Sequence, residues 1–124
     1  MRIDRYIDAP AAVVWQILVD LDAWPQWGPS VASAVLDDGA RRIAAGSTGR
    51  VTTALGVEMP FRITEFEPGR RWAWAVAGVA ATTHTVTAEG DGCRLSFGAP
   101  WWATPYLAVC AVALARIDRL ARPR

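Results

Sequence analysis

Glycine recurs at short intervals through the middle of the chain, and this spacing constrains the fold more than any other feature. Four separators of four residues each contain glycine: LGVE, EPGR, AGVA and EGDG. The runs between them alternate in side-chain character, with the period of two that is typical of strands. Connections this short join neighbouring strands as antiparallel hairpins. The predicted strands are Arg50–Leu55, Met59–Phe66, Arg71–Ala77, Ala81–Ala88 and Cys93–Phe97.

The flanking segments add two more strands and the helices. Arg2–Ile7 alternates as a first strand, and Val31–Leu36 returns to the period of two before a DDG turn. Between them, apolar residues recur at helical spacing after Pro10, which suits a first helical turn. The predicted helices are Pro10–Val19, a turn or two within Leu21–Trp27, and a long helix over Pro105–Arg122 that has to cover the sheet. The buried stripe of the long helix is predicted to hold Tyr106, Cys110, Ala113, Ile117 and Leu120.

Composition excludes several classes of function. The chain has no lysine and no asparagine, which removes a P-loop, a Schiff-base lysine and a glycosylation sequon. Its formal net charge is only +1, whereas a nucleic-acid surface normally carries a strong basic bias. One histidine and two cysteines are too few for the common metal sites. We therefore expect no metal, no cofactor and no nucleic-acid partner.

The length and the apolar runs place the chain in a broad class. With 124 residues, of which 52% are hydrophobic, it fits one domain over residues 1–124 with a sizeable core. The opening MRIDRYIDAP lacks the apolar stretch of a signal peptide. The longest apolar run, Ala103–Ala115, is shorter than the roughly 20 residues of a membrane span. We expect a cytoplasmic protein that is a monomer or a homodimer.

Three segments in this order resemble the START-related helix-grip superfamily, especially its polyketide cyclase/dehydrase and lipid-transport branch. They are IDAPAAVVWQILVDLDAWPQW, PFRITEFEPGRRWAWAV and THTVTAEGDGCRLSF. The resemblance implies an α+β helix-grip fold, in which a seven-stranded antiparallel sheet curves around a long C-terminal helix. It also implies two short helices after the first strand and an internal cavity. Members of the superfamily bind or act on apolar small molecules such as lipids and polyketides.

The strand and helix patterns then predict which side chains face that cavity. Trp72, Trp74 and Val76 share one face of a strand, and these rings either contact a ligand or simply fill the core. The expected cavity residues are Phe61, Trp72, Trp74, His84, Val86, Leu95, Phe97, Tyr106 and Cys110. The resemblance implies a cavity mouth at Trp24, Trp27 and Trp101, in which Trp24 and Trp27 close one end and Trp101 and Trp102 cap another edge.

Catalytic groups are few, and we assign none. His84 is the one candidate, because imidazole titrates near neutral pH, but it needs a second positioned group. Tyr106 and Glu65 are the available partners. Strict alternation would point Glu65 into the core and Phe66 out of it, whereas a bulge near Glu65 would reverse both, and the sequence leaves these alternatives open.

The favoured function is binding of a small apolar ligand between the sheet and the long helix, with His84 orienting a ligand oxygen. The alternatives are a cyclase or aromatase that uses His84 with Tyr106 or Glu65, and a protein-interaction module. Cys93 and Cys110 are predicted to be buried and reduced. Trp74→Ala is predicted to destabilise the fold by about 3–5 kcal/mol.

Overall fold

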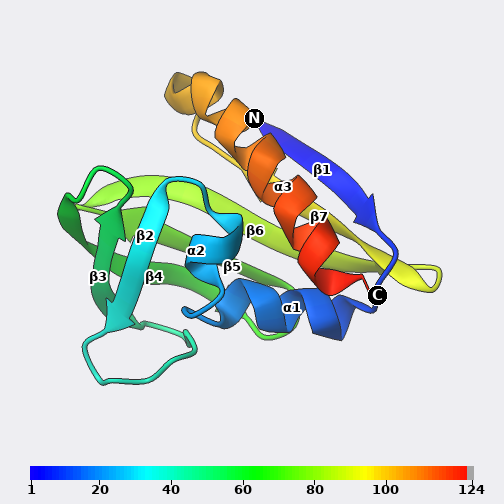
Figure 1. Cartoon of the computed structure of the whole chain (residues 1–124), viewed down its shortest axis with the longest axis horizontal. Coiled ribbons are helices and arrows are strands. Elements are labelled where there is room, and N and C mark those ends of the chain that lie inside the picture. The colour runs from blue at the N-terminus through cyan, green and yellow to red at the C-terminus, as the bar shows by residue number, and fades with distance from the viewer. Residues whose placement is uncertain (123–124) are drawn as a thin grey trace.

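A computed structural model describes residues 1–122 of the chain, and it shows one seven-stranded sheet with helices packed on its concave side (Figure 1). The strand order is β1-β7-β6-β5-β4-β3-β2, and every neighbouring pair is antiparallel. The predicted α+β fold class is confirmed. The elements are β1 (Arg2–Ile7), α1 (Ala11–Val19), α2 (Trp24–Trp27), β2 (Val31–Leu36), β3 (Thr48–Thr53), β4 (Glu58–Glu67), β5 (Arg71–Val76), β6 (Val79–Glu89), β7 (Gly92–Gly98), the 3₁₀ helix η1 (Trp101–Tyr106) and α3 (Leu107–Ala121).

Different helices cover different ends of the sheet. Figure 1 shows α3 lying across β1 and β7, while β2, β3 and β4 lie at the other end of the sheet beside α2. α1 and α2 both contact α3. The buried apolar side chains form a hydrophobic cluster between these helices and the sheet. Residues 123 and 124, the last two of the domain predicted over residues 1–124, lie outside the described part.

A bulge in β4 settles the alternation that the sequence left open. The β4–β5 register shifts between Ile63 and Glu65, where β4 advances by two residues while β5 advances by one. Phe66 thereby turns toward the core, where its ring lies 5.6 Å from the ring of Trp15 on α1. Glu65 is exposed and its carboxylate accepts a hydrogen bond from Arg71 Nε at 2.7 Å. Burial of the large ring therefore outweighs regular strand geometry at this point.

The last helix differs from the prediction at both ends. The predicted Pro105–Arg122 helix is a 3₁₀ segment, η1, followed by α3 from Leu107. Pro105 lacks a backbone N–H, and Ala103 has non-helical dihedral angles, so the first turns do not continue the α-helix. At the other end Leu120, predicted on the buried stripe, is 40% exposed, and Ala121 is buried instead.

A buried carboxylate fastens α3 to the edge strand β1. Asp118 is buried, and its Oδ2 accepts a hydrogen bond from Arg5 Nε at 2.7 Å. Its Oδ1 lies 2.8 Å from Arg122 Nε, one turn further along the chain. A buried charge is tolerated only when it is paired, so Arg5 on the inner face of β1 and Asp118 on α3 set the position of the helix on the sheet. This ion pair was not predicted from the sequence.

Gly49 in β3 permits the close approach of two neighbouring strands. A Cβ atom at this position would overlap the carbonyl oxygen of Val35 and would press on the ring of Phe61. Gly49→Ala is expected to lower the free energy of unfolding by about 1–3 kcal/mol or more, because the strands would have to separate. The neighbouring Arg50→Ala, which removes only an exposed ion pair, is the control. Denaturant titration measures both, and equal midpoints for the two variants would contradict the close approach.

Candidate functional site

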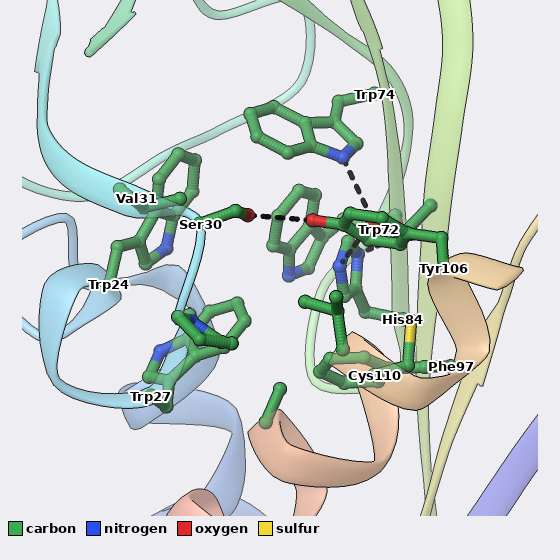
Figure 2. A pocket seen from close by; sticks show the side chains of 15 residues that line it. Trp24, Trp27, Ser30, Val31, Trp72, Trp74, His84, Phe97, Tyr106 and Cys110 are labelled. Carbon is green, nitrogen blue, oxygen red and sulfur yellow. Dashed lines mark hydrogen bonds between the residues drawn. The ribbon is translucent and has the colours of Figure 1, made fainter. Parts of the chain in front are cut away.

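Three flat rings are stacked in the centre of the concave side. The indoles of Trp24 and Trp72 are nearly parallel, with an interplanar angle of 6° and centroids 5.4 Å apart. The imidazole of His84 covers the other face of Trp72 at 3.8 Å and 24°. Trp72 is 1% exposed and His84 is 2% exposed. This aromatic stack, Trp24–Trp72–His84, occupies the space in which the sequence analysis expected a ligand cavity (Figure 2).

Further rings meet the stack edge-on. Trp27 and Phe97 approach His84 at 6.2 Å and 4.7 Å, and both are nearly perpendicular to it. Trp74 makes edge contacts with Trp24 at 5.3 Å and with Phe61 at 5.5 Å. Edge-to-face pairs are a favourable arrangement for aromatic rings, because a positive ring edge meets a negative face. The interior is therefore filled with specific aromatic contacts.

The two tryptophans of α2 are anchored by hydrogen bonds to the end of α1. Trp24 Nε1 donates to the carbonyl oxygen of Leu18 at 2.9 Å, and Trp27 Nε1 donates to that of Ile17 at 3.2 Å. These carbonyl groups lie in the last turn of α1, where no later turn satisfies them. Pro25 lies in the first turn of α2, where its missing N–H costs nothing. The WPQW turn is thus a structural wedge between α1 and the sheet.

A directed chain of hydrogen bonds fixes the tautomer of His84. Its Nδ1 lies 3.2 Å from the carbonyl oxygen of Trp72, which can only accept, so Nδ1 carries the proton. Its Nε2 then accepts from the hydroxyl of Thr82 at 3.1 Å. Thr82 Oγ1 in turn accepts from Trp74 Nε1 at 3.0 Å. Both ring nitrogens of His84 are occupied by protein groups.

The surroundings of His84 keep it neutral. Burial lowers the pKa of His84 from 6.5 to about 3, because the charged imidazolium would lose its hydration. The hydrogen bond to the Trp72 carbonyl opposes this shift in the pKa, and the nearby Arg71 guanidinium adds to it. At neutral pH the imidazole is therefore uncharged and fully hydrogen-bonded. This arrangement suits a structural role better than proton transfer.

Two spaces flank the stack. The inner pocket has a volume of about 30 Å³, which is room for one or two water molecules. The outer groove has a volume of about 380 Å³ and opens to solvent between η1 and the ends of β2 to β6. The inner pocket is lined by Trp24, Trp27, Gly28, Pro29, Ser30, Val31, Trp72, Trp74, Thr82, His84, Phe97, Tyr106, Val109, Cys110 and Ala113. The outer groove is lined by Ser30, Val31, Val51, Thr53, Met59, Trp74, Val76, Val79, Ala80, Ala81, Thr82, Ala99, Pro100, Trp102, Ala103 and Tyr106.

Comparison with known proteins identifies the family. A family model described as polyketide cyclase / dehydrase and lipid transport matches residues 1–118. The chain belongs to this family. A search of curated proteins found no match.

Solved structures share the fold. Protein CV1439 from Chromobacterium violaceum is 23% identical, with a TM-score of 0.67 and coverage of 100% of this chain and 97% of that one. Protein NE0264 from Nitrosomonas europaea is 14% identical, with a TM-score of 0.71 over 97% and 92%. Protein BH1534 from Bacillus halodurans is 11% identical, with a TM-score of 0.73 over 98% and 95%. At these identities the likeness establishes the fold alone.

Within this family fold, the predicted cavity residues fall into three groups. Trp74 and Tyr106 line both the inner pocket and the outer groove. Trp72, His84, Phe97 and Cys110 line the inner pocket only, together with Trp24 and Trp27, which were expected at the mouth. Phe61, Val86 and Leu95 are buried in the core and line neither space.

The mouth differs from the expectation at η1. Trp101 is 78% exposed and lines neither space, whereas its neighbour Trp102 lines the outer groove. Most groove residues at the ends of β2, β3 and β4, such as Val51 and Met59, were not predicted as site residues. Their apolar character is indistinguishable from that of core residues in the sequence, and only the position of η1 makes them a wall.

The remaining candidates carry little reactive chemistry. Cys93 and Cys110 are free and buried, as predicted, and burial raises the pKa of each thiol. Glu65 lies on the outer face with Arg71 and lines neither space. Within residues 1–122, no group of three or more His, Cys, Asp or Glu side chains could hold a metal ion.

Replacement of the central ring should cost far more stability than replacement of its neighbour. Trp72→Ala is expected to lower the free energy of unfolding by about 3–5 kcal/mol, because it removes a buried ring that is stacked on both faces. The sequence predicted the same loss of about 3–5 kcal/mol for Trp74→Ala. The loss of unfolding free energy should be smaller there, because this ring is partly exposed at the groove. Denaturant titration compares the two variants. A larger loss for Trp74→Ala would contradict the central position of Trp72.

The neutral state of His84 predicts a specific acid sensitivity. Between pH 6.5 and about 3 the unfolded chain binds a proton at His84 that the folded chain does not bind. The stabilising contribution of neutral His84 should therefore be fully present above pH 6.5. The free energy of unfolding should fall as the pH falls from 6.5 to about 3. His84→Gln should lack this contribution, so that its stability profile is flatter by up to about 1.4 kcal/mol per pH unit.

Urea titrations at several pH values measure this difference. His84 is the sole histidine of the chain, so no other imidazole titrates in this window. Both proteins carry the same carboxylates, whose contributions cancel in the comparison. Parallel profiles for the wild-type protein and His84→Gln would show that His84 titrates normally in the folded state.

Proposed function

We propose that this protein binds a small apolar molecule in the outer groove between η1 and the ends of β2 to β6. The observation that carries the proposal is the groove itself. Its volume of about 380 Å³ lies in the range of roughly 300–1,000 Å³ that is usual for small-molecule sites. The inner pocket is too small for more than one functional group.

The lining of the groove suits an apolar ligand with few polar atoms. Aliphatic side chains and alanines alternate with two indoles, Trp74 and Trp102. The side-chain polar atoms are the hydroxyl groups of Ser30, Thr53, Thr82 and Tyr106, together with the nitrogens of the two indoles. A mostly apolar wall with a few placed hydrogen-bonding groups is the usual composition of a small-molecule site.

The same lining favours binding over catalysis. Among the described residues, Tyr106 is the one titratable group in the wall of the groove. Of the trio considered for a cyclase, Glu65 lies outside the groove and His84 uses both ring nitrogens within the protein. A cyclase or dehydrase would need a second positioned group beside the substrate.

The surroundings in which the protein acts are also part of the proposal. Among residues 1–122, no helix combines the length and the apolar character needed to cross a bilayer. We propose a cytoplasmic protein, a monomer or a homodimer, whose partner is a small molecule and not a nucleic acid, since the net charge is only +1.

A plug in the groove tests the site. Ala80 is exposed and lines the groove, so Ala80→Phe should fill part of it without a change in the core. With 2-nonanone as the probe, calorimetry should show at least a tenfold loss of affinity in this variant. Ala111→Phe on the exposed side of α3 is the matched control and should bind normally.

Two outcomes would contradict the proposal. Equal affinity of Ala80→Phe and the wild-type protein would place the ligand elsewhere, and no binding by the wild-type protein would leave the groove without this function. Native mass spectrometry of the purified protein should in addition reveal a small apolar molecule that co-purifies with the wild-type chain and is lost from Ala80→Phe.

A further inference from the structure

We infer that the ligand ends in a hydrogen-bond acceptor, such as a carbonyl oxygen, and that Trp72 Nε1 donates to it in the inner pocket. This inference rests on the proposed function and adds the chemistry of the ligand. Its starting point is that Trp72 Nε1 is completely buried and has no acceptor among the described residues.

The missing partner stands out because the neighbouring indole nitrogens all have one. The indole nitrogens of Trp24, Trp27 and Trp74 all donate to protein oxygens. A buried donor without an acceptor destabilises the folded protein, and the free N–H of Trp72 is available to an acceptor on a ligand. Trp72 also cannot turn away, because its ring is held between Trp24 and His84.

The Trp72 ring, which carries the free donor, lines the inner pocket. Figure 2 shows the Trp72 ring in the middle of the pocket, with its nitrogen on the side of Trp27. An indole N–H donates and cannot accept. The group that enters must therefore supply an acceptor, and the volume of about 30 Å³ limits it to a few atoms. A carbonyl group meets both conditions, whereas a ring does not fit.

The inner pocket is next to the groove and shares a wall with it. Five residues line both spaces: Ser30, Val31, Trp74, Thr82 and Tyr106. A hydrogen bond of 2.7 Å between Ser30 Oγ and Tyr106 Oη spans this wall (Figure 2). Tyr106 is 38% exposed, so water can replace this bond at little cost when the side chain moves. The apolar body of a ligand would then lie in the groove, with its polar end past Tyr106.

The test compares two probes that differ only in the acceptor. They are 2-nonanone and 2-methyl-1-nonene, in which a C=CH₂ group replaces the C=O group. Trp72→Phe keeps an aromatic ring in the stack and removes the N–H. It should weaken the binding of the ketone by about five- to tenfold, the usual effect of one hydrogen bond, and change the affinity for the alkene by less than about twofold. Trp101→Phe, on a ring that lines neither space, is the control and should change neither affinity.

A second readout follows the wild-type protein and uses the variant only to assign one signal. The Trp72 indole proton should shift downfield in a ¹H–¹⁵N spectrum when 2-nonanone is added and stay near its position with the alkene. Assignment comes from the signal that is absent in Trp72→Phe.

The outcomes separate this inference from the proposed function. One outcome is that Ala80→Phe abolishes the binding of both probes, while Trp72→Phe changes both affinities equally and the indole proton does not move. The proposed groove site would then hold, and the inferred hydrogen bond from Trp72 Nε1 to the ligand would be wrong. Water alone then satisfies the donor. If neither probe binds the wild-type protein, the proposed function itself fails.

Discussion

The sandwich of Trp72 between Trp24 and His84 is the contact on which the rest of the structure depends. It joins the consecutive strands β5 and β6 to α2, which is distant from them in the sequence, in one stack with centroid separations of 5.4 Å and 3.8 Å. His84 can take part only as a neutral ring, because a charged imidazolium would lose its hydration there. The chain from Trp74 through Thr82 to His84 and the Trp72 carbonyl satisfies both of its nitrogens.

The filled interior explains where the free space of the molecule lies. In a curved sheet that is gripped by a helix, bulky rings at the centre leave room only toward the ends of the strands. The change from η1 to α3 at Pro105 and Leu107 holds Trp102 and Tyr106 over those ends. The groove is therefore a consequence of the aromatic stack and of the 3₁₀ segment together. A filled core covered by an α-helix that continued straight through Pro105 would not create this groove.

The sequence predicted the fold well because its strongest signals are local. Glycine separators located the hairpins, and apolar spacing located α1 and α3. The inward position of Phe66 needed a bulge, and the ring that Phe66 contacts, Trp15, belongs to another element. Trp72 and Trp74 share a strand face, yet one is central and the other borders the groove. Trp24 of α2 stacks on Trp72, whereas the β5–β6 register shifts beside Trp74, between Ala73 and Ala75.

The site was harder to predict because its polar contacts join distant segments. Ser30 and Tyr106 are 76 residues apart, and Arg5 and Asp118 are 113 apart. His84 was singled out for chemistry because imidazole titrates near neutral pH, but its pKa depends on burial that no spacing rule reveals. Thr82 gave the nearest usable signal, since a residue two positions away on the same strand faces the same side. That alternation could have shown that the imidazole had a partner.

A crystal structure of the protein with bound 2-nonanone would test the central claim most directly. The account predicts that the alkyl chain lies in the groove between Trp74 and Trp102, with the Trp24–Trp72–His84 stack undisturbed and the carbonyl oxygen within hydrogen-bonding distance of Trp72 Nε1. A ligand inserted between the stacked rings, or a ligand hydrogen-bonded to a ring nitrogen of His84, would contradict it.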